Sequence, residues 1–390
     1  MIRLNKRLLA QVPLILMLIG FLFIQTAKPL GLTSIVSSGT WIIFISCVFV
    51  LFQKIIIRKV VDIATIALYL LIITTLFTAF CYGDFSYSTI VVVGCFLEIP
   101  ILMCAFTKDI EKSIRKMLFY FNIVLSLFYV VISLSPLAHL YTTAWGAKEI
   151  PELTLSYNNP NETAMYLFAC VVVLASMLPE AKNKIFRIFV SVDICYLIYL
   201  IILTKSRTII FVTAIFLFLI ILYNKKSIPK YFRIIAFCIP VVFMTIVLYF
   251  RDNLKDYNIL GDTFDTGRDS IYSRVFDDLN FLEFLFGDFS FKFQNLHNAV
   301  ISIFGTIGIL GTILFYYFLL RKFKDINIGN TTSVSRKRAF IGLLCIVLIT
   351  STEAAFFTAG SAFSISVFSI YLLALPSEES STPKSTITNK

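Results

Sequence analysis

The composition of the chain excludes a soluble globular protein. Of its 390 residues, 58% are hydrophobic and only 15% are charged, and the formal net charge is +11. Soluble domains carry about 25% charged residues. Apolar runs of about 17 to 25 residues recur along the chain, and a helix of that length crosses about 30 Å of hydrocarbon. The sequence therefore predicts an all-α polytopic membrane protein. A β-barrel is excluded, because its strands alternate in polarity.

The apolar runs predict about twelve transmembrane helices in one integral-membrane domain, residues 1–375. The first run, residues 8–25, follows the basic start MIRLNKR but lacks a small-x-small cleavage site, so we interpret it as a retained span. Residues 376–390 are expected to form a disordered cytoplasmic tail. The predicted spans lie near 8–26, 34–52, 62–82, 87–107, 117–137, 160–178, 186–204, 207–223, 233–250, 297–320, 339–356 and 359–375.

Basic residues are distributed unevenly between the two sets of loops that these spans create. One set, which includes both termini, holds 25 of the 34 lysines and arginines. Cytoplasmic loops of membrane proteins carry the excess of Lys and Arg, so this set and both termini are predicted to face the cytoplasm. The positive charge is then a topology signal that also attracts anionic membrane lipids, and it requires no nucleic-acid partner.

The longest loops fall on the other, outer side. They are roughly residues 138–159 and 251–296, and a long loop in a compact protein is usually functional or disordered. In the second loop, the stretch DTGRDSIYSRVFDDLNFLEFLFG places Ile271, Val275 and Leu279 four residues apart. That spacing predicts an amphipathic helix within this large extracytoplasmic loop, lying in the membrane interface.

Two charges interrupt a long apolar stretch, residues 185–223. They are Lys205 and Arg207, in the sequence LIILTKSRTIIFV. A charge left in hydrocarbon costs at least about 2.5–3.5 kcal/mol, so these residues predict a very short turn at the outer surface. Glu98 and Asp193 are acids inside predicted spans, and we expect them to pair with neighbouring helices.

Several ionisable groups gather on the predicted outer side. They include Arg207, Arg268, Arg274 and both histidines, His139 and His297. The planar guanidinium of arginine donates bidentate hydrogen bonds and stays charged, which suits a diphosphate. A membrane-bound diphosphate that faces outward suggests a lipid-linked sugar. The chain has no Walker A sequence, no Cys-x-x-Cys pair and no Asp-x-Asp pair, so neither a nucleotide cofactor nor a metal is expected.

Four short motifs follow one another on this side of the membrane. They are NNPNETAMY at Asn158 to Tyr166, KSR at Lys205 to Arg207, TGRDSIY at Thr266 to Tyr272, and LHNAVISIFGTIGILG from Leu296 to Gly311. In this order they resemble the O-antigen polymerase and O-antigen ligase superfamily of bacterial envelope polysaccharide assembly. The resemblance covers residues 158–311, and the five spans before it match only in hydropathy. One departure is Asp288, where the family often has a second glycine.

The resemblance implies a GT-C-like, metal-independent glycosyltransferase at the outer face of the bacterial cytoplasmic membrane. An acceptor hydroxyl would attack the anomeric carbon of a glycan carried by undecaprenyl diphosphate, which leaves. Arg207 and Arg268 are expected to hold the diphosphate. His297 is expected to deprotonate or orient the acceptor, or only to cap the re-entering helix, and Glu162 is the alternative base. The other expected substrate-binding residues are Lys205, Arg274, Asn159, Asn161, Asp269 and Asn298.

The motifs do not separate two acceptor classes. A polymerase joins lipid-linked oligosaccharide repeat units into O-antigen or capsular polysaccharide, and a ligase transfers the finished chain to a lipid A core or another acceptor. We expect a polymerase, because polymerases are more diverse in sequence. A flippase of lipid-linked oligosaccharides is a less favoured alternative, since few ionisable residues lie near the predicted midplane. The expected partners are the undecaprenyl-diphosphate-linked oligosaccharide, membrane lipids, and a chain-length regulator and flippase of the same pathway.

Overall fold

The structure is a computed structural model of the whole chain. Most of the helical part and the segments around it can be described. The described residues are 6–53, 63–81, 97–104, 112–136, 138, 140–145, 148–157, 159–224, 226–249, 258–259, 262–263, 268–288, 297–329, 331–353 and 361–376.

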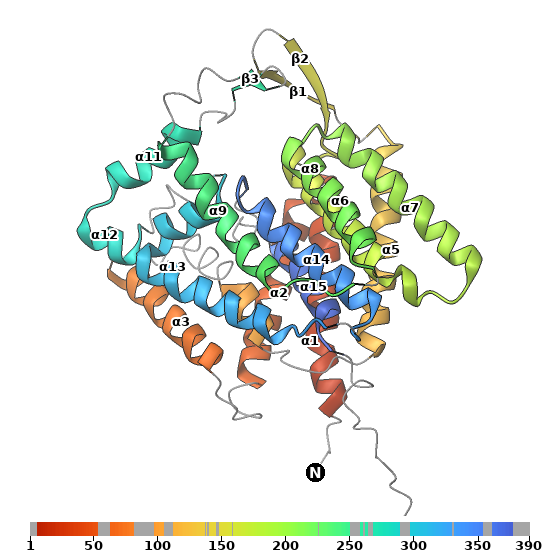
Figure 1. Ribbon diagram of the computed structural model, residues 1–390, viewed down its shortest axis with the longest axis horizontal. Helices are drawn as coiled ribbons and strands as arrows, with labels where there is room; N and C mark the ends of the chain where they lie inside the picture. Colours follow the sequence, from red (N-terminus) through yellow and green to blue (C-terminus); the bar gives the residue numbers. More distant parts are fainter. Residues whose placement is uncertain are drawn as a thin grey trace, which may run out of the picture.

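The chain folds into a bundle of helices with a β-hairpin projecting from one end (Figure 1). The helices are α1 (Lys6–Ala27), α2 (Thr33–Gln53), α3 (Ile63–Cys81), α5 (Lys112–Ser133), α6 (Pro160–Met177), η2 (Leu178–Glu180), α7 (Lys184–Leu203), α8 (Arg207–Leu222), α9 (Tyr231–Tyr249), α11 (Arg268–Asp278), α12 (Phe281–Phe286), α13 (Ala299–Asp325), α14 (Val334–Ile349) and α15 (Ser361–Ala374). Residues 97–104 are also helical. The antiparallel pairs are β1 (Leu140–Trp145) with β2 (Lys148–Leu153), and β3 (Asn258–Ile259) with β4 (Asp262–Thr263).

The described helices have the length and composition of a membrane protein. Six are long and apolar enough to cross a membrane, namely α2, α5, α6, α7, α9 and α13. Shorter apolar helices lie at Gln11–Ala27, Ile63–Thr78, Arg207–Leu222 and Phe363–Ala374. The prediction of an all-α membrane protein is confirmed at this level. The predicted span at 87–107 lies partly outside the described residues.

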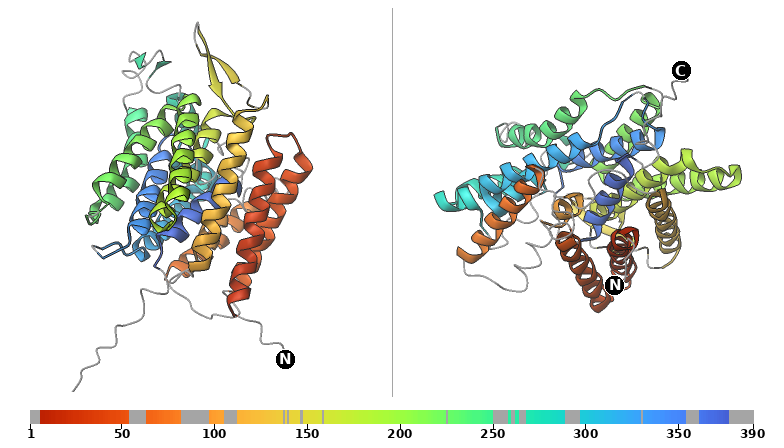
Figure 2. Two further views of the ribbon diagram at one scale, coloured as in Figure 1. Left: turned by 90° about the vertical axis from the view of Figure 1, so that its right-hand side faces the viewer. Right: turned by 90° about the horizontal axis from the view of Figure 1, so that it is seen from below.

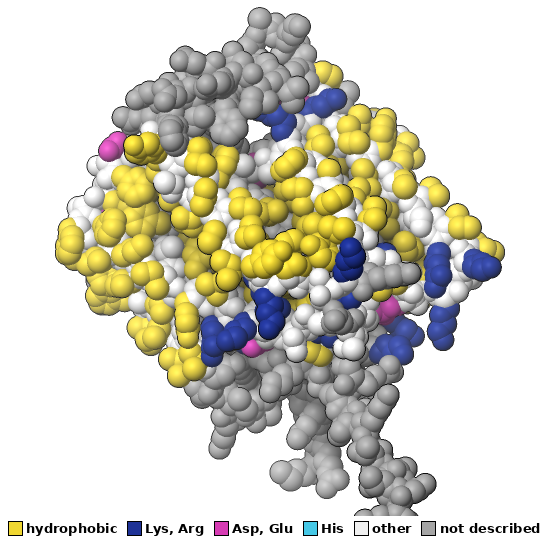
Figure 3. Space-filling view, in the orientation of Figure 1, with side chains coloured by type: hydrophobic (Ala, Val, Ile, Leu, Met, Phe, Trp, Pro, Cys, Tyr) yellow, Lys and Arg dark blue, Asp and Glu magenta, His cyan; other side chains and the backbone are white. Residues whose placement is uncertain are grey.

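The surface of the bundle agrees with contact to lipid. Large apolar side chains point outward from several helices, including Ile188, Val192, Phe211 and Phe218 of α7 and α8, each more than 60% exposed. Figure 3 shows hydrophobic side chains across the middle of one face, with most of the visible Lys and Arg on the side away from the hairpin. Water would make such an apolar surface costly, whereas a bilayer solvates it.

Helix α6 forms the centre of the bundle. All of its residues from 163 to 177 are buried, which is expected of a helix that is apolar on every side. It packs against α5, α7, α14 and α15, and Figure 2 shows these helices gathered beneath the hairpin. The first turn of α6 is therefore held from several sides at the hairpin end of the molecule.

Arginines fasten the opposite end of the bundle. The last carbonyls of a helix have no partner within it, and a cation there also complements the helix dipole. The donations are Arg115 Nη1 to Leu373 O (2.7 Å), Arg336 Nε to Ala374 O (3.1 Å), Arg338 Nη1 to Ala175 O (2.8 Å) and Arg233 Nη2 to Ile326 O (2.6 Å). Part of the basic charge at this end is thus bound to the C-terminal ends of α6, α13 and α15.

The predicted amphipathic helix is present, but its apolar face does not lie free in the membrane interface. Tyr272 and Val275 of α11 are fully buried against residues of α9 and α13, among them Val247 and Phe304. The segment is also two helices instead of one, because Asn280 forms a capping box that starts α12. The apolar face expected to meet lipid therefore packs against the protein.

The end of α12 inserts into a break in α13. Gly308 has φ 67° and ψ −176° inside α13, and Gly287 has φ 86°. A Cβ on Gly308 would lie 2.3 Å from Leu285 O, and one on Gly287 would lie 2.3 Å from Thr306 O. The backbone of Asp288 donates to Gly305 O at 2.8 Å. The turn forms with Asp288 in place of a second glycine, because Gly287 alone supplies the left-handed conformation.

The acids inside predicted spans have different surroundings. Asp193 of α7 accepts a hydrogen bond of 2.6 Å from Ser126 Oγ of α5, so this acid pairs with a neighbouring helix as expected. Glu98 is buried, and its Oε1 has no hydrogen-bond partner within the described part of the chain. A buried hydrogen bond such as that between Ser126 and Asp193 links two helices in a membrane, where lipid offers no hydrogen-bond partner.

Candidate functional site

The first turn of α6 begins with a side-chain cap. Asn159 Oδ1 accepts a hydrogen bond of 2.7 Å from the backbone of Asn161, and Pro160 occupies the first helical position. Asparagine at the cap followed by proline is a strong helix start, since proline has no N–H to leave unsatisfied. Asn159 is therefore occupied in shaping the turn, which presents Asn161 and Glu162 at the hairpin end of the bundle.

Glu353 joins two of the predicted site residues. It lies in the turn that follows α14, and its side chain is 8% exposed. Asn161 Nδ2 donates to Glu353 Oε1 at 2.9 Å. Glu353 Oε2 lies 3.6 Å from Nδ1 of His297, whose side chain is 34% exposed. This separation is an ion-pair distance and is too long for a good hydrogen bond. A carboxylate that faces Nδ1 leaves Nε2 as the imidazole nitrogen that faces away.

His297 is held in an unusual backbone conformation by the residue that follows it. Its φ is 53°, a left-handed value that a residue with a side chain adopts only under constraint. Asn298 caps α13 by accepting from Val300 N (2.9 Å) and Ile301 N (3.2 Å). Its amide nitrogen donates to Ser351 O at 2.9 Å. Asn298 is fully buried and bound to main-chain groups, so it caps α13 and fixes the backbone next to His297.

The predicted turn between α7 and α8 is present. Lys205 has φ 56° and is exposed, Ser206 precedes α8, and Arg207 is the exposed first residue of that helix. Thr352 Oγ1 donates to Thr208 Oγ1 at 3.0 Å. Because Thr352 and Thr208 are direct neighbours of Glu353 and Arg207, the charged turn lies beside the turn that carries Glu353.

The third motif meets the site through a tyrosine. The hydroxyl of Tyr272 in α11 donates to the backbone oxygen of His297 at 3.3 Å. Arg268 and Asp269 begin this helix and Arg274 lies farther along it, but their side chains fall outside the described residues. The start of α11 at Arg268 places this arginine at the N-terminal end of a helix that touches His297.

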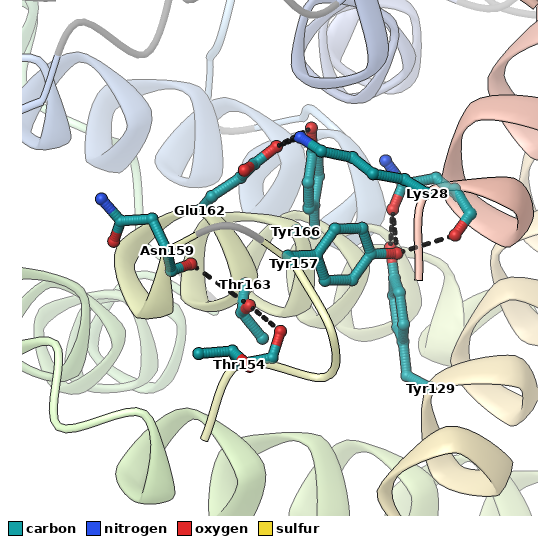
Figure 4. Close-up of polar contacts among 9 residues, drawn as sticks. Lys28, Tyr129, Thr154, Tyr157, Asn159, Glu162, Thr163 and Tyr166 are labelled. Carbon is teal, nitrogen blue, oxygen red and sulfur yellow. Dashed lines mark hydrogen bonds and ion pairs between the residues drawn. The ribbon is translucent and has the colours of Figure 1, made fainter. Parts of the chain in front are cut away.

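Glu162 is bound to a lysine from the N-terminal part of the sequence. Lys28 follows α1, and its Nζ lies 2.5 Å from Glu162 Oε1. Tyr166 also donates to this oxygen, at 3.1 Å. Figure 4 shows Lys28 extending past Tyr157 and Tyr166 to reach the carboxylate. Lys28 and Tyr166 both occupy Glu162 Oε1, whereas Nε2 of His297 faces away from the Glu353 carboxylate, so the geometry favours His297 over Glu162 as the base.

A tyrosine in front of α6 completes this cluster. Tyr157 is buried and donates to Gln25 Oε1 at 2.7 Å. Burial, and after it the charge of Glu162, raises the pKa of Tyr157 well above its ordinary value. Tyr157 therefore keeps its proton and stays a donor across the physiological pH range.

Four motif segments thus meet at one end of the bundle. Glu353, which joins two of them, and Lys28, which binds Glu162, were not selected as site residues from the sequence. The sequence assigns Glu353 to the outer side but within the predicted span 339–356, whereas α14 ends at Ile349 and leaves Glu353 in a turn. Lys28 was a single basic residue in a short outer loop. What distinguishes Lys28 in the sequence is its position, since the other basic residues of the N-terminal region lie on the predicted inner side.

The chain matches no known family model, no curated protein and no solved structure. Within the described residues, no group of three or more His, Cys, Asp or Glu side chains is placed to hold a metal ion. The contacts among Asn161, Glu353 and His297, with the residues around them, are therefore the features that point to a function.

Proposed function

We propose that the protein is a membrane glycosyltransferase that polymerises undecaprenyl-diphosphate-linked oligosaccharide repeat units into O-antigen or capsular polysaccharide. It acts on the outer face of the bacterial cytoplasmic membrane, with both termini in the cytoplasm. In this proposal the chain has about twelve transmembrane helices in a GT-C-like arrangement. Of the ten site residues selected from the sequence, His297, Arg207 and Arg268 act on the substrate in this proposal, and Glu353 is added to them.

The observation that carries the proposal is the chain of contacts from Asn161 through Glu353 to His297. The carboxylate lies 2.9 Å from the Asn161 amide and 3.6 Å from His297 Nδ1. A base oriented by a second group is the arrangement that activates a hydroxyl nucleophile. The two charged segments of the motif set, the 205–207 turn and the start of α11, reach the same place through Thr208 and Tyr272.

The proposed step is a displacement at the anomeric carbon of the donor. His297 Nε2 takes the proton of an acceptor hydroxyl as its oxygen forms the new glycosidic bond. The bond from the anomeric carbon to the diphosphate oxygen breaks, and undecaprenyl diphosphate leaves with the electron pair. Glu353 stabilises the imidazolium that forms. Arg207 and Arg268 stabilise the negative charge that develops on the leaving diphosphate.

The positions of the charged groups support transfer over transport. Transporters place ionisable residues near the membrane midplane, whereas the charged contacts of this site lie at one end of the bundle. A ligase would use the same donor and the same base, so the acceptor alone distinguishes it. Polymerase is proposed because the divergence of this chain is typical of that class.

The surface polysaccharide of a deletion strain tests the proposal. A polymerase deletion leaves single repeat units on the final acceptor, and a ligase deletion leaves long chains on the carrier lipid. Repeat units trapped inside the cell indicate a flippase. The chain supplied on a plasmid should restore long polysaccharide, and His297→Ala should not. Full restoration by His297→Ala would refute the role of His297, and an unchanged polysaccharide in the deletion strain would refute the function.

A further inference from the structure

Lys28 occupies a fixed point at the end of α1. Its backbone donates to Ile24 O at 3.1 Å, so it continues the hydrogen bonding of the last helical turn. Its side chain is 25% exposed and that of Glu162 is 22% exposed. The ion pair is thus partly shielded from water. A fully exposed ion pair would contribute little to stability.

The end of α1 is itself tied to two other segments. Gln25 Oε1 accepts from Tyr129 of α5 at 2.8 Å and from Tyr157, in front of α6, at 2.7 Å. Tyr157 also contacts Gln25 O at 2.9 Å. Gln25 is fully buried, so water does not readily replace these bonds. The contacts of Gln25 therefore fix the end of α1, and with it Lys28, without any help from Glu162.

Two consecutive residues in the first turn of α6 make contacts in different directions. Glu162 binds Lys28, and Asn161 binds Glu353. Successive residues of a helix are rotated by about 100° around its axis, so the two contacts hold different sides of the first turn. A change in the Lys28 contact rotates or shifts the turn and changes the position from which Asn161 holds Glu353.

We propose that Lys28 is a positioning residue for the pair formed by Glu353 and His297. It acts through Glu162 and Asn161 and touches no reacting group. The inference rests on the proposed function, because the pair has a catalytic role only if a hydroxyl is activated there. The structural part of the inference is independent of that function. It states that α1 sets the position of the first turn of α6 and of the turn at 350–353.

The test compares three variants of the full-length protein in nanodiscs, with a purified lipid-linked repeat unit as substrate. Lys28→Met removes the charge and keeps the length of the side chain. The double variant Lys28→Glu with Glu162→Lys exchanges the two charges. The matched control is Lys182→Met, which removes an exposed charge between α6 and α7, at the other end of the bundle.

We expect Lys28→Met to lower kcat about tenfold or more with little change in KM, since a displacement of about 1 Å can cost about 100-fold. The exchanged pair should recover more than half of the lost kcat, and the control should equal the parent. A parental kcat for Lys28→Met overturns the inference. So does an exchanged pair that is as stable as the parent but as slow as Lys28→Met, because Lys28 or Glu162 would then contact the substrate.

Hydrogen–deuterium exchange supplies a readout that needs no activity. In Lys28→Met the amides of residues 161–164 and 350–353 should exchange several-fold faster than in the parent, and in Lys182→Met they should not. Equal exchange in Lys28→Met and the parent overturns the inference even if the enzyme is active. An inactive parent with faster exchange in Lys28→Met refutes the proposed function and leaves the positioning role supported.

Discussion

Replacement of Glu353 by glutamine tests the proposed chemistry with little change in shape. Glutamine keeps an oxygen that can accept from Asn161, but it removes the charge that faces His297. The two side chains are 3.6 Å apart, which corresponds to about 4.6 kcal/mol of attraction for the imidazolium at an effective dielectric constant of about 20. His297 is one-third exposed, and solvent screening reduces this to about 2 kcal/mol.

A loss of about 2 kcal/mol corresponds to about a 30-fold lower kcat. The amide group also offers a donor toward Nδ1 and favours the tautomer that carries its proton on Nε2, which raises the expected loss to about 100-fold or more. The assay follows turnover of a lipid-linked repeat unit by the purified protein, with thermal stability as the check on folding. A stable Glu353→Gln protein with at least half of the parental kcat would refute the assignment of His297 and Glu353 as the base and its partner.

Three further predictions concern sidedness, the arginine turn and the break in α13. Cysteine at position 273 should react with an impermeant thiol reagent in intact cells and cysteine at position 330 should not, with the reverse pattern refuting the orientation. Arg207→Ala should abolish polymer growth and Arg207→Lys should restore little, because a point charge cannot make the bidentate contact; equal activity of the lysine variant would exclude the clamp. Gly308→Ala should destabilise the protein by about 2–4 kcal/mol, since its Cβ would lie 2.3 Å from Leu285 O at φ 67°. Gly329→Ala, with nothing within 4 Å, is its control in thermal unfolding.

The helices could be predicted from the sequence because an apolar run of sufficient length has few alternatives in a membrane protein. The turn at 204–207 was also predictable, since Lys205 and Arg207 are too costly to leave in hydrocarbon. The boundary between α11 and α12 can also be predicted from the sequence, although the apolar spacing alone predicts a single helix there. Asn280 and Glu283 have the spacing of a capping box in the sequence NFLE.

Glu353 and Lys28 could not be selected from the sequence, for physical reasons. The charge pattern assigns Glu353 to the outer side, but a hydropathy average over residues 339–356 hides the point where α14 ends and leaves Glu353 inside a span, without a partner. The ion pair of Lys28 with Glu162 joins residues that are 134 positions apart, and no local pattern reports a contact between distant segments. The distribution of Lys and Arg predicts that the four motifs share one side of the membrane, but the contacts that join them come from tertiary packing.

The arginines that cap helix ends carry a second consequence for how the chain is made. On the proposed orientation, these four arginines first act during membrane insertion, when the number of positive charges determines which loops remain in the cytoplasm. They are Arg115, Arg233, Arg336 and Arg338. The same guanidinium groups later close the carbonyl ends of α6, α13 and α15. Lysine satisfies the first requirement. Arg115 and Arg336 each donate from two nitrogens to separate partners, and the single ammonium of lysine does not reproduce this planar geometry. Insertion and packing therefore place different demands on one set of side chains.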